Sequence, residues 1–350
     1  MRPVPSLCRF DLFGDKRKSR ARFGIVGELS ASPREYRRYI VGMSRKIVLG
    51  TRGSELARTQ TRMVADRLHA QWEDVTIETN IIRTMGDESD SKTKSLDRRA
   101  GRKGLFTAAI ERALLAHEID LAIHSAKDLP SELNRGVEIA AVLPRGSVND
   151  VLVAKQAGGL AALAEGAIIA TGSVRRKHQI NWQYPRVETV DLRGNVPTRL
   201  RKLAENNWDA IVLARAGLER LGVSLARNEI NFEGRKFFVE IFSCEIFLPA
   251  GGQGVIALQI CSNDESSREI VEPINDRDTL LCLRAEREFL RLLQCDCQSP
   301  VGVLAEMENG EMRLRAQIFE HGSASPREGQ VEGARDDGEH LAAQLLKEIR

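Results

Sequence analysis

Short apolar runs alternate with amphipathic stretches along most of the chain. In the amphipathic stretches the apolar positions recur near helical spacing, whereas the short runs have the length and composition of strands. The first part of the pattern predicts strands at residues 46–51, 75–82, 120–125 and 137–142. It also predicts helices at 54–72 and 105–118, and the charged, apolar-poor residues 86–103 between them indicate a mobile loop.

The pattern then starts again, which predicts a second group of strands and helices. Strands are expected at residues 150–154, 167–171, 187–192 and 209–214, with helices that begin near Ser173, Pro197 and Ala216. Strands that alternate with helices form βαβ units, so we expect two α/β domains with parallel sheets. Residues 222–249 are irregular and bear aromatic side chains, and residues 254–260 predict one more strand.

From about Asp276 the pattern changes to that of a small α+β domain. A helix is expected to run to Gln294, and it is followed by strands at 301–306 and 312–318, a polar stretch, and a terminal helix at 337–349. The predicted fold class is therefore α/β, with two larger domains and a small third α+β domain. The expected boundaries are an extension at 1–44, a first domain at 45–145 plus 254–272, a second at 146–250 and a third at 276–350.

Charge separates the N-terminal extension from the rest of the chain. Residues 1–44 hold ten Lys or Arg and four Asp or Glu, whereas the remainder holds 42 basic and 45 acidic residues, a net charge of −3. A body of this charge argues against a nucleic-acid-binding protein. The extension lacks the apolar core of a secretory signal, and its acids weaken the case for a transit peptide. We therefore expect a disordered extension or a translation start at Met43.

Composition narrows the remaining classes. No apolar run approaches the length that spans a bilayer, so no membrane partner is expected. Six cysteines in 350 residues form no disulfide framework, which favours a cytoplasmic, reducing compartment. The six histidines are scattered without the Cys/His spacing of a zinc site, so no metal is expected.

Polar side chains, most of them cationic or hydroxyl and one a carboxylate, follow four of the predicted strands, at the carboxyl ends where α/β sheets bind ligands. They are Arg52 and Ser54; Ser125, Lys127 and Asp128; Thr171, Ser173, Arg175 and Arg176; and Arg193 and Arg199. Each group alone could be a solvated charge pair or an ordinary helix cap. Cations in the first turn of a helix oppose the helix dipole, however, so a bound anion would explain Arg175, Arg176 and Arg199.

Together these groups predict a cleft for a ligand that carries several carboxylates or phosphates. Arginine suits carboxylates through its bidentate fork, and Asp128 in such a cleft could handle protons. No GxxxxGK(S/T) phosphate loop is present, so nucleotide phosphates are the weaker choice. A non-enzymatic two-lobed anion-binding receptor, or the effector domain of a regulator, would suit the same cleft. A receptor should carry a signal peptide and a regulator a DNA-reading helix pair, and neither is visible.

Eight segments, in this order, resemble the porphobilinogen deaminase (hydroxymethylbilane synthase) family. They are LGTRGSELA, GRKGLF, DLAIHSAKDLP, GSVRRKHQ, LRGNVPTRL, DAIVLARAGLERLG, LPAGGQG and CQSPVG. The resemblance implies a transferase of tetrapyrrole and heme biosynthesis that joins four porphobilinogen molecules head to tail, with loss of ammonia, on a covalently bound dipyrromethane primer. It then releases hydroxymethylbilane by hydrolysis. The resemblance also implies a monomer, with two periplasmic-binding-protein-like α/β domains and a third domain that carries the cofactor cysteine.

The resemblance also implies roles for individual residues. Asp128 matches the catalytic carboxylate, and Cys297 matches the cysteine that holds the cofactor through a thioether. The positions that hold the cofactor side chains match Ser125, Lys127, Thr171, Ser173, Arg175 and Arg176. The positions that bind the substrate or lie beside it match Arg52, Ser54, Arg193, Arg199, Lys103, Phe106 and Gln253.

The pair Cys295 and Cys297 stands one residue apart, before Pro300. A metal site would lack further ligands, and a disulfide between residues so close would be strained. Cys297 has the family's distance to the Pro-Val-Gly turn, whereas the role of Cys295 stays open as a second thiol that could compete. In addition, residues 222–249 look longer and more aromatic than is usual in the family.

Overall fold

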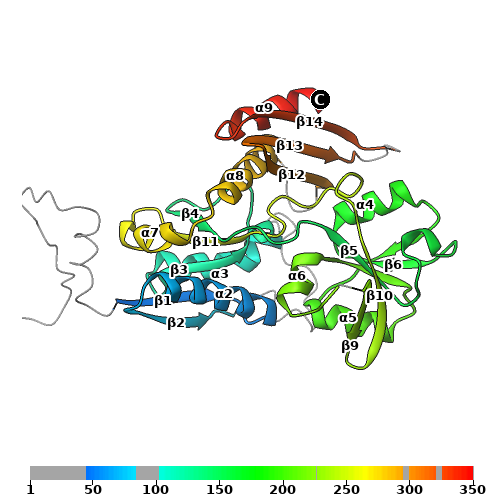
Figure 1. Cartoon of the computed structure of the whole chain (residues 1–350), viewed down its shortest axis with the longest axis horizontal. Coiled ribbons are helices and arrows are strands. Elements are labelled where there is room, and N and C mark those ends of the chain that lie inside the picture. Colours follow the sequence, from blue (N-terminus) through cyan, green and yellow to red (C-terminus); the bar gives the residue numbers. More distant parts are fainter. Residues whose placement is uncertain (1–44, 84–101, 226, 295–298, 321–324, 350) are drawn as a thin grey trace, which may run out of the picture. The chain divides into compact units, whose positions relative to one another are not determined.

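The computed structural model describes residues 45–83, 102–225, 227–294, 299–320 and 325–349 (Figure 1). The expectations for the extension at 1–44 and for most of the loop at 86–103 concern residues outside this part. The loop expectation is wrong at its end, because the backbone of residues 102 and 103 is already helical. Within the described residues no helix is long and apolar enough to cross a membrane.

The first sheet has the strand order β2-β1-β3-β11-β4. Its strands are β1 (Arg45–Thr51), β2 (Val75–Ile81), β3 (Leu121–Ser125), β4 (Val137–Val142) and β11 (Ile256–Cys261). β1 pairs in parallel with β2 and β3, but β11 lies antiparallel to both β3 and β4. The expectation of a purely parallel sheet is therefore wrong. The physical reason is that β11 begins where β3 ends: Ala126 N donates to the Val255 carbonyl, 3.0 Å away, so the returning strand runs backwards.

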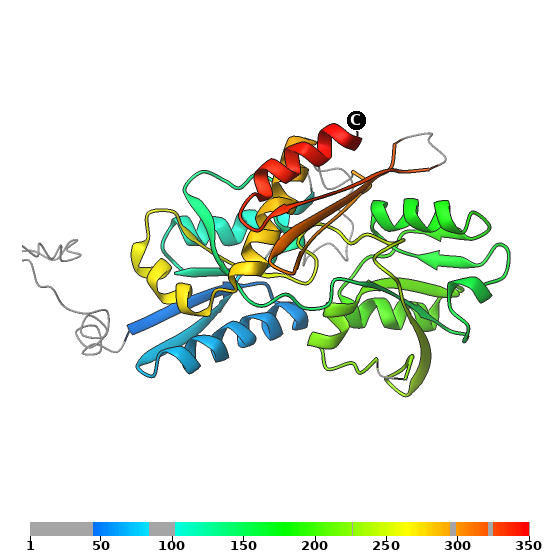
Figure 2. The ribbon, with the colours of Figure 1, turned by 45° about the horizontal axis from the view of Figure 1, so that its top comes forward.

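Helices cover both faces of the first sheet. They are α2 (Glu55–Gln71), α3 (Arg102–Leu115) and α7 (Glu265–Val271). Val64 and Leu68 of α2 are buried in one apolar cluster with Ile270 of α7, and Ile110 and Leu114 of α3 belong to another. Figure 2 shows α2 running beside β1 and β2. Burial of this apolar surface holds the carboxyl ends of the strands in fixed positions.

The second sheet has the strand order β7-β6-β8-β5-β10-β9. Its strands are β5 (Asp150–Ala154), β6 (Ile168–Ala170), β7 (Glu188–Val190), β8 (Ala210–Ala214), β9 (Glu229–Phe232) and β10 (Arg235–Ile241). β6 is parallel to β7 and β8, whereas β5 is antiparallel to β8 and β10. Residues 222–249 are thus wrongly expected to be irregular. They contain the β9–β10 hairpin, which forms because Phe237 and Val239 alternate into the buried core.

Three helices pack on the second sheet: α4 (Val174–Gln183), α5 (Val196–Glu205) and α6 (Arg215–Arg220). Leu200 of α5 and Leu218 of α6 are buried with one face of the sheet, and Ile180 of α4 is buried with the other. Ser173 caps α4 as expected, and Asn195 caps α5 by accepting from the Thr198 amide.

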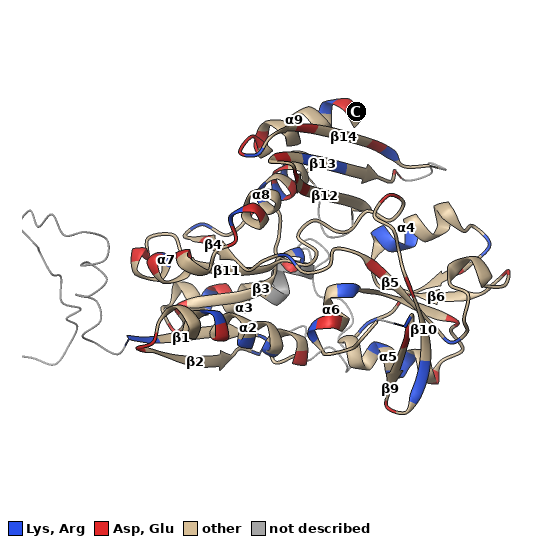
Figure 3. Ribbon diagram, in the orientation of Figure 1, with Lys and Arg blue, Asp and Glu red and all other residues tan. Residues whose placement is uncertain are grey.

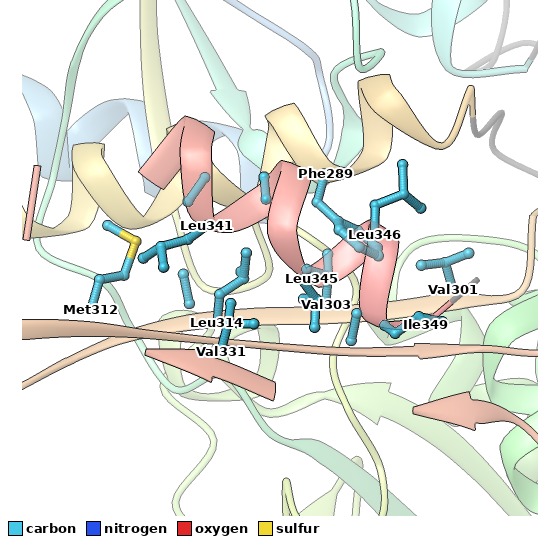
Figure 4. Close-up of a cluster of buried hydrophobic side chains, with 14 of the residues drawn as sticks. Phe289, Val301, Val303, Met312, Leu314, Val331, Leu341, Leu345, Leu346 and Ile349 are labelled. Carbon is cyan, nitrogen blue, oxygen red and sulfur yellow. The ribbon is translucent and has the colours of Figure 1, made fainter. Parts of the chain in front are cut away.

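The third sheet has the order β12-β13-β14 and is covered by two helices. The elements are α8 (Arg277–Leu292), β12 (Val301–Glu308), β13 (Glu311–Ile318), β14 (Arg327–Ala334) and α9 (Gly338–Ile349). Figure 4 shows side chains of α8 and α9, among them Phe289 and Leu345, pointing toward Val303 of the sheet. The polar stretch expected before the last helix contains β14. The sequence of β14 is mostly polar because only Val331 of this edge strand is buried.

Short 3-10 helices complete the described elements. They are η1 (Ala126–Asp128), η2 (Leu160–Ala162) and η3 (Glu272–Ile274). The observed architecture is two mixed α/β sheets with helices on both faces and a small α+β unit, so the predicted α/β class is confirmed.

Candidate active site

A cleft of about 1840 Å³ brings the strand-end residues of both larger sheets together. Of the described residues that line it, twelve are Lys or Arg and three are Asp or Glu, so the cleft is cationic. Figure 3 shows basic residues at the start of α4, which borders it. The lining includes these residues expected from sequence: Arg52, Ser54, Ser125, Lys127, Asp128, Ser173, Arg175, Arg176, Arg193, Arg199 and Gln253.

One expected residue, Thr171, lies outside the lining, and two others remain predictions because their side chains are not described. Thr171 is almost fully buried and is not part of the lining; its hydroxyl accepts a hydrogen bond from the Ser173 amide. Lys103 and Phe106 lie in the first turns of α3, but their side chains are outside the described residues.

Asp128 lies in η1, directly after β3, in a turn closed by a hydrogen bond from Leu129 N to the Ala126 carbonyl. Its half-buried carboxylate has neither a hydrogen bond nor an ion pair with any described residue. Its charge nevertheless favours the protonated forms of Lys127 and Arg199, which places it among the cations of the cleft. A carboxylate in this position is available to a ligand.

Lys127 precedes this carboxylate and faces Gln253, to whose Oε1 its Nζ donates over 3.3 Å. Burial, with repulsion from Arg176, lowers the pKa of Lys127 to about 8, against the attraction of Asp128 and Asp150. The lysine therefore remains an ammonium group at neutral pH, ready to bind an anion.

Asp150 is the principal site residue that the sequence patterns did not reveal. It begins β5 and is fully buried between two guanidinium groups: Arg175 Nη2 lies 2.8 Å from Oδ2 and Arg176 Nη2 lies 2.7 Å from Oδ1. Gln253 Nε2 donates to the same Oδ1 over 2.9 Å. The two arginines hold the pKa of Asp150 well below its usual range, against the effect of burial. The available signal was a charged residue opening an otherwise apolar strand, since a buried carboxylate needs a cationic partner.

Four of the residues predicted to bind substrate follow β1 and β7: Arg52, Ser54, Arg193 and Arg199. Arg199, in the first turn of α5, donates from Nε to the Gly194 carbonyl over 2.7 Å, which aims its guanidinium at the cleft. Burial and repulsion from Arg176 lower its pKa to about 10. Ser54 accepts from the Ala57 amide as the cap of α2, so its hydroxyl proton remains able to donate.

Comparison with known proteins identifies the family. The family model described as "Porphobilinogen deaminase, dipyromethane cofactor binding domain" matches residues 47–269, and "Porphobilinogen deaminase, C-terminal domain" matches residues 280–350. The chain belongs to the porphobilinogen deaminase family. The porphobilinogen deaminase of Syntrophomonas wolfei is 39% identical over 308 residues, which cover 87% of this chain and 96% of that protein. That of Roseiflexus sp. is 40% identical over 307 residues, 88% of this chain and 96% of that protein.

Membership of the porphobilinogen deaminase family confirms the resemblance and makes the chain an enzyme, a transferase of tetrapyrrole biosynthesis. The non-enzymatic receptor or regulator is therefore not favoured. Among solved structures, the methionine-binding protein MetQ aligns with a TM-score of 0.40 and 12% identity, over 67% of this chain and 92% of that chain. This likeness is too distant to carry an argument.

The residues on the α4 side of the cleft fit the cofactor of porphobilinogen deaminases. Arg175 and Arg176 share one carboxylate, which leaves the group with a net positive charge. The buried Nε atoms of both arginines lack a hydrogen-bond partner among the described residues. Excess positive charge and unused donors are what carboxylate side chains on a pyrrole primer require.

Six further described cations of the cleft were not singled out from the sequence: Lys177, Lys202, Arg83, Arg220, Arg287 and Arg291. The last three lie on helices away from predicted strand ends, and Arg83 lies shortly after β2. Arg287 donates to the Ser131 carbonyl over 3.0 Å, and burial lowers its pKa to about 10. Within the described residues no cluster of three or more His, Cys, Asp or Glu side chains could hold a metal ion.

Both cysteines of the pair, Cys295 and Cys297, lie outside the described residues. Gln294 and Ser299, which flank the segment, both line the cleft. Burial raises the pKa of the Cys282 thiol to about 12 and that of Cys244 to about 11, so neither is an activated thiol.

Proposed function

We propose that this enzyme joins four porphobilinogen molecules head to tail, releases ammonia at each step, and frees hydroxymethylbilane by hydrolysis. The observation that carries the proposal is the carboxylate of Asp128 at the end of β3. It has no hydrogen bond or ion pair with a described residue, and it lies in a cleft whose described lining includes twelve Lys or Arg side chains. Porphobilinogen bears an acetate, a propionate and an aminomethyl group. The cations can bind the acetate and the propionate. The carboxylate can stabilise the positive charge that develops when the amino group leaves as ammonia.

The cationic side chains bind and orient the carboxylates of the reactants. Arg52, Arg193 and Arg199 would bind incoming porphobilinogen, since they follow β1 and β7 and line the same cleft. Each charge-assisted hydrogen bond contributes about 1.5–3 kcal/mol. Two-point binding by planar guanidinium forks also fixes the ring in one plane, which raises the fraction of encounters in a reactive orientation.

Ser125, Lys127, Ser173, Arg175 and Arg176 would hold the cofactor side chains. When bound to Cys297, a dipyrromethane supplies the primer pyrrole that accepts the first porphobilinogen. Asp150 keeps the two guanidinium groups in place, because each donates to one of its oxygens. Ser125 is in turn fixed by Gln60, whose Nε2 lies 2.9 Å from its Oγ.

Asp128 would act on the reacting atoms. As ammonia leaves, positive charge spreads to the pyrrole nitrogen, and a carboxylate facing that N–H stabilises it. The same oxygen atoms can take the proton that the coupled ring loses. Lys127 and Arg199 keep cations beside this carboxylate, so the reacting ring is enclosed by charges of both signs.

The test is turnover of porphobilinogen by purified protein. The wild-type enzyme should consume porphobilinogen and form hydroxymethylbilane, and Asp128→Asn should lower kcat by about 10²–10⁴-fold with KM little changed. Glu132→Gln is the matched control, because Glu132 is another acid of the lining. Wild-type protein that makes no hydroxymethylbilane, or Asp128→Asn at full rate, would refute the proposal.

We also propose that the cofactor is attached to Cys297. Intact-protein mass should show two added pyrrole units, which Cys297→Ser abolishes and Cys295→Ser retains. The reverse result would move the attachment to Cys295. We further propose a cytoplasmic location, supported by the cysteine usage, and no nucleic-acid partner, supported by the net charge of residues 45–350. The lack of a long apolar run supports the absence of a membrane partner. We propose a monomer because the family resemblance implies one. Light scattering after size-exclusion chromatography tests the oligomeric state.

A further inference from the structure

Helix α4 carries two sets of side chains with different partners. Arg175 and Arg176 bind Asp150 at the wall of the cleft. One turn further on, His178, Gln179 and Trp182 meet residues of the third sheet. The helix that presents the cofactor-binding arginines is therefore also the helix on which the third sheet docks.

The docking contact centres on Phe319, which follows β13 and is 6% exposed. Its ring centroid lies 5.7 Å from that of His178 and 5.9 Å from that of Trp182, the latter edge to face. Tilted and edge-to-face rings at these separations attract one another beyond the effect of burial.

A buried pair of amides lies beside this ring. Gln179 Nε2 donates to Gln317 Oε1 over 2.7 Å, and Gln317 Nε2 can donate to the Ile246 carbonyl, 3.3 Å away, or to Glu328. The same Gln179 Nε2 also lies 2.9 Å from the Leu248 carbonyl. Buried amides with satisfied partners fix one arrangement of the elements that carry them, because any shift leaves a buried polar group unpaired.

Phe319 also contacts Pro300, the second described residue after the cysteine pair. Its amide donates to the Pro300 carbonyl over 3.1 Å, and the preceding residue, Ile318, pairs with Val301 across the β12–β13 ladder. Pro300 stands three residues after Cys297, and Ser299 lines the cleft. The ring of Phe319 thus contacts α4, while its backbone contacts Pro300.

We infer that Phe319, supported by Gln317 and Gln179, is a positioning residue that sets the distance between Pro300, which follows the cysteine pair in the sequence, and the arginine pair of α4. The inference rests on the proposed function. The primer is attached to a cysteine at one end, and its carboxylates are bound by Arg175 and Arg176. It reacts only if these two anchoring points are correctly placed relative to each other. Loss of the docking contact lets the tether move, and small misplacements of a reacting group cost orders of magnitude in rate.

The expected kinetic signature is a split between kcat and KM. Phe319→Ala should lower kcat at least tenfold and leave KM for porphobilinogen within twofold, because the cations proposed to bind porphobilinogen follow β1 and β7, whereas Phe319 follows β13. Phe319→Tyr, which keeps the ring, should restore kcat to within threefold of wild type. If Phe319→Ala fails to fold, Phe319→Leu retains apolar volume without the ring contacts and serves the same purpose.

Val331→Ala is the matched control for general loosening of the third sheet. Val331 lies in β14 and is buried with side chains of α8 and α9 in an apolar cluster whose described members include no residue of α4. It should lower the temperature of unfolding as Phe319→Ala does while leaving kcat within twofold. An equal fall in kcat for both variants, or no fall for Phe319→Ala, would overturn the inference.

A second readout does not depend on turnover. In a Trp72→Phe, Trp208→Phe background, Trp182 is the remaining tryptophan and reports its contact with Phe319. Phe319→Ala should at least double the acrylamide quenching constant of Trp182, and Val331→Ala should leave it unchanged. Unchanged quenching in Phe319→Ala would refute the docking contact. Normal docking in a wild-type protein without turnover would instead refute the proposed function.

Discussion

A single carboxylate, that of Asp150, sets the charge on the α4 side of the cleft. Buried ion pairs contribute little net stability relative to apolar residues, but removal of one partner leaves a buried charge uncompensated. Here one carboxylate serves two guanidinium groups, and Gln253 adds a third donor. The site therefore keeps its arginines ordered and retains positive charge for a ligand.

Asp150→Asn should lower the free energy of unfolding by about 3–5 kcal/mol, because two buried cations lose their counter-charge. Urea denaturation measures the change. Glu229→Gln is the control: Glu229 pairs with Lys236 on the surface, where such pairs contribute at most about 1 kcal/mol. Equal effects of the two substitutions would show that the arginines do not depend on Asp150.

The ammonium group of Lys127 gives the site a pH limit. Because burial lowers its pKa to about 8, the cation is present below that pH and is lost as the pH rises through it. The rate at which cofactor-free protein takes up pyrrole units should fall above pH 8. In Lys127→Arg the charge persists, so the fall should move to higher pH.

Lys177→Arg is the matched control for this profile, since Lys177 lines the same cleft but pairs with Asp191 at the surface. Its profile should follow that of the wild type. A fall near pH 8 that persists in Lys127→Arg would assign the titration to another group.

At the residue scale, the cations at strand ends were predictable because an arginine at a helix start has no local explanation. Their partner Asp150 was not predictable, because it stands 25 residues before Arg175 and the pattern indicates only that it begins a strand. Pairing of buried charges depends on three-dimensional proximity, which periodicity does not contain. The anion invoked for these arginines is thus supplied in part by the chain itself.

At the scale of elements, the segment between β10 and β11 depends on glycine. Gly252 has φ +76°, and a Cβ there would lie 2.9 Å from Lys127 N and 3.0 Å from the Ala126 carbonyl carbon. Both contacts are with the backbone of η1, which cannot move without displacing Asp128. The glycine therefore allows two turns of the site to lie against each other.

Gly252→Ala should destabilise the protein by about 1–3 kcal/mol and lower kcat at least tenfold, since backbone strain and the displaced turn act together. Gly234→Ala is the control that shows the effect of backbone strain without a steric clash. Gly234 has φ +75°, and a Cβ there would meet nothing within 4 Å. That variant should lose about 1 kcal/mol with kcat unchanged. Denaturation and steady-state kinetics separate the two outcomes, and full activity in Gly252→Ala would contradict the packing.

Element prediction succeeded where one face of a strand or helix is buried and failed where burial is sparse. The strands at 137–142 and 150–154 have the predicted bounds. β14 was missed because its alternate residues are exposed, and the β9–β10 hairpin because aromatic residues masked its alternation. Edge strands expose one side, so their apolar signal is weak.

At the scale of the whole molecule, one buried carboxylate connects three regions. Glu286 of α8 accepts from Arg145 Nη1 over 2.7 Å, from the Gly252 amide over 2.6 Å and from the Ala305 amide over 2.8 Å. These donors belong to the connection after β4, the turn before β11 and strand β12. Glu286 thereby binds two parts of the molecule at once. One is the pair of segments that connect the two larger sheets, and the other is the third sheet.

Glu286→Gln should lower the free energy of unfolding by about 3–5 kcal/mol, because it leaves the largely enclosed Arg145 without its counter-charge and presents an NH₂ group to backbone donors. Glu288 of the same helix forms an ion pair with the exposed Arg291, so Glu288→Gln should cost at most about 1 kcal/mol. Calorimetry would measure both. Equal losses of unfolding free energy in the two variants would show that Glu286 does not hold these regions together.

The α/β class and the small third unit followed from the order of the predicted elements, but strand direction did not. Alternation of strands and helices favours parallel pairing, and β1, β2 and β3 obey it. β11 departs from it because the chain returns from the second sheet at the end where β3 finishes. A return over more than a hundred residues leaves no local trace in the hydrophobic pattern.

The position of β11 also bears on how the protein is made. In the first sheet, β4 pairs with β11 and is not bonded to another strand of that sheet. Its partner is synthesised only after the whole of the second sheet, which is continuous from residue 150 to residue 241. Domains fold as units while the ribosome is still adding residues. On the ribosome, the second sheet can therefore close before the first, although its residues emerge later.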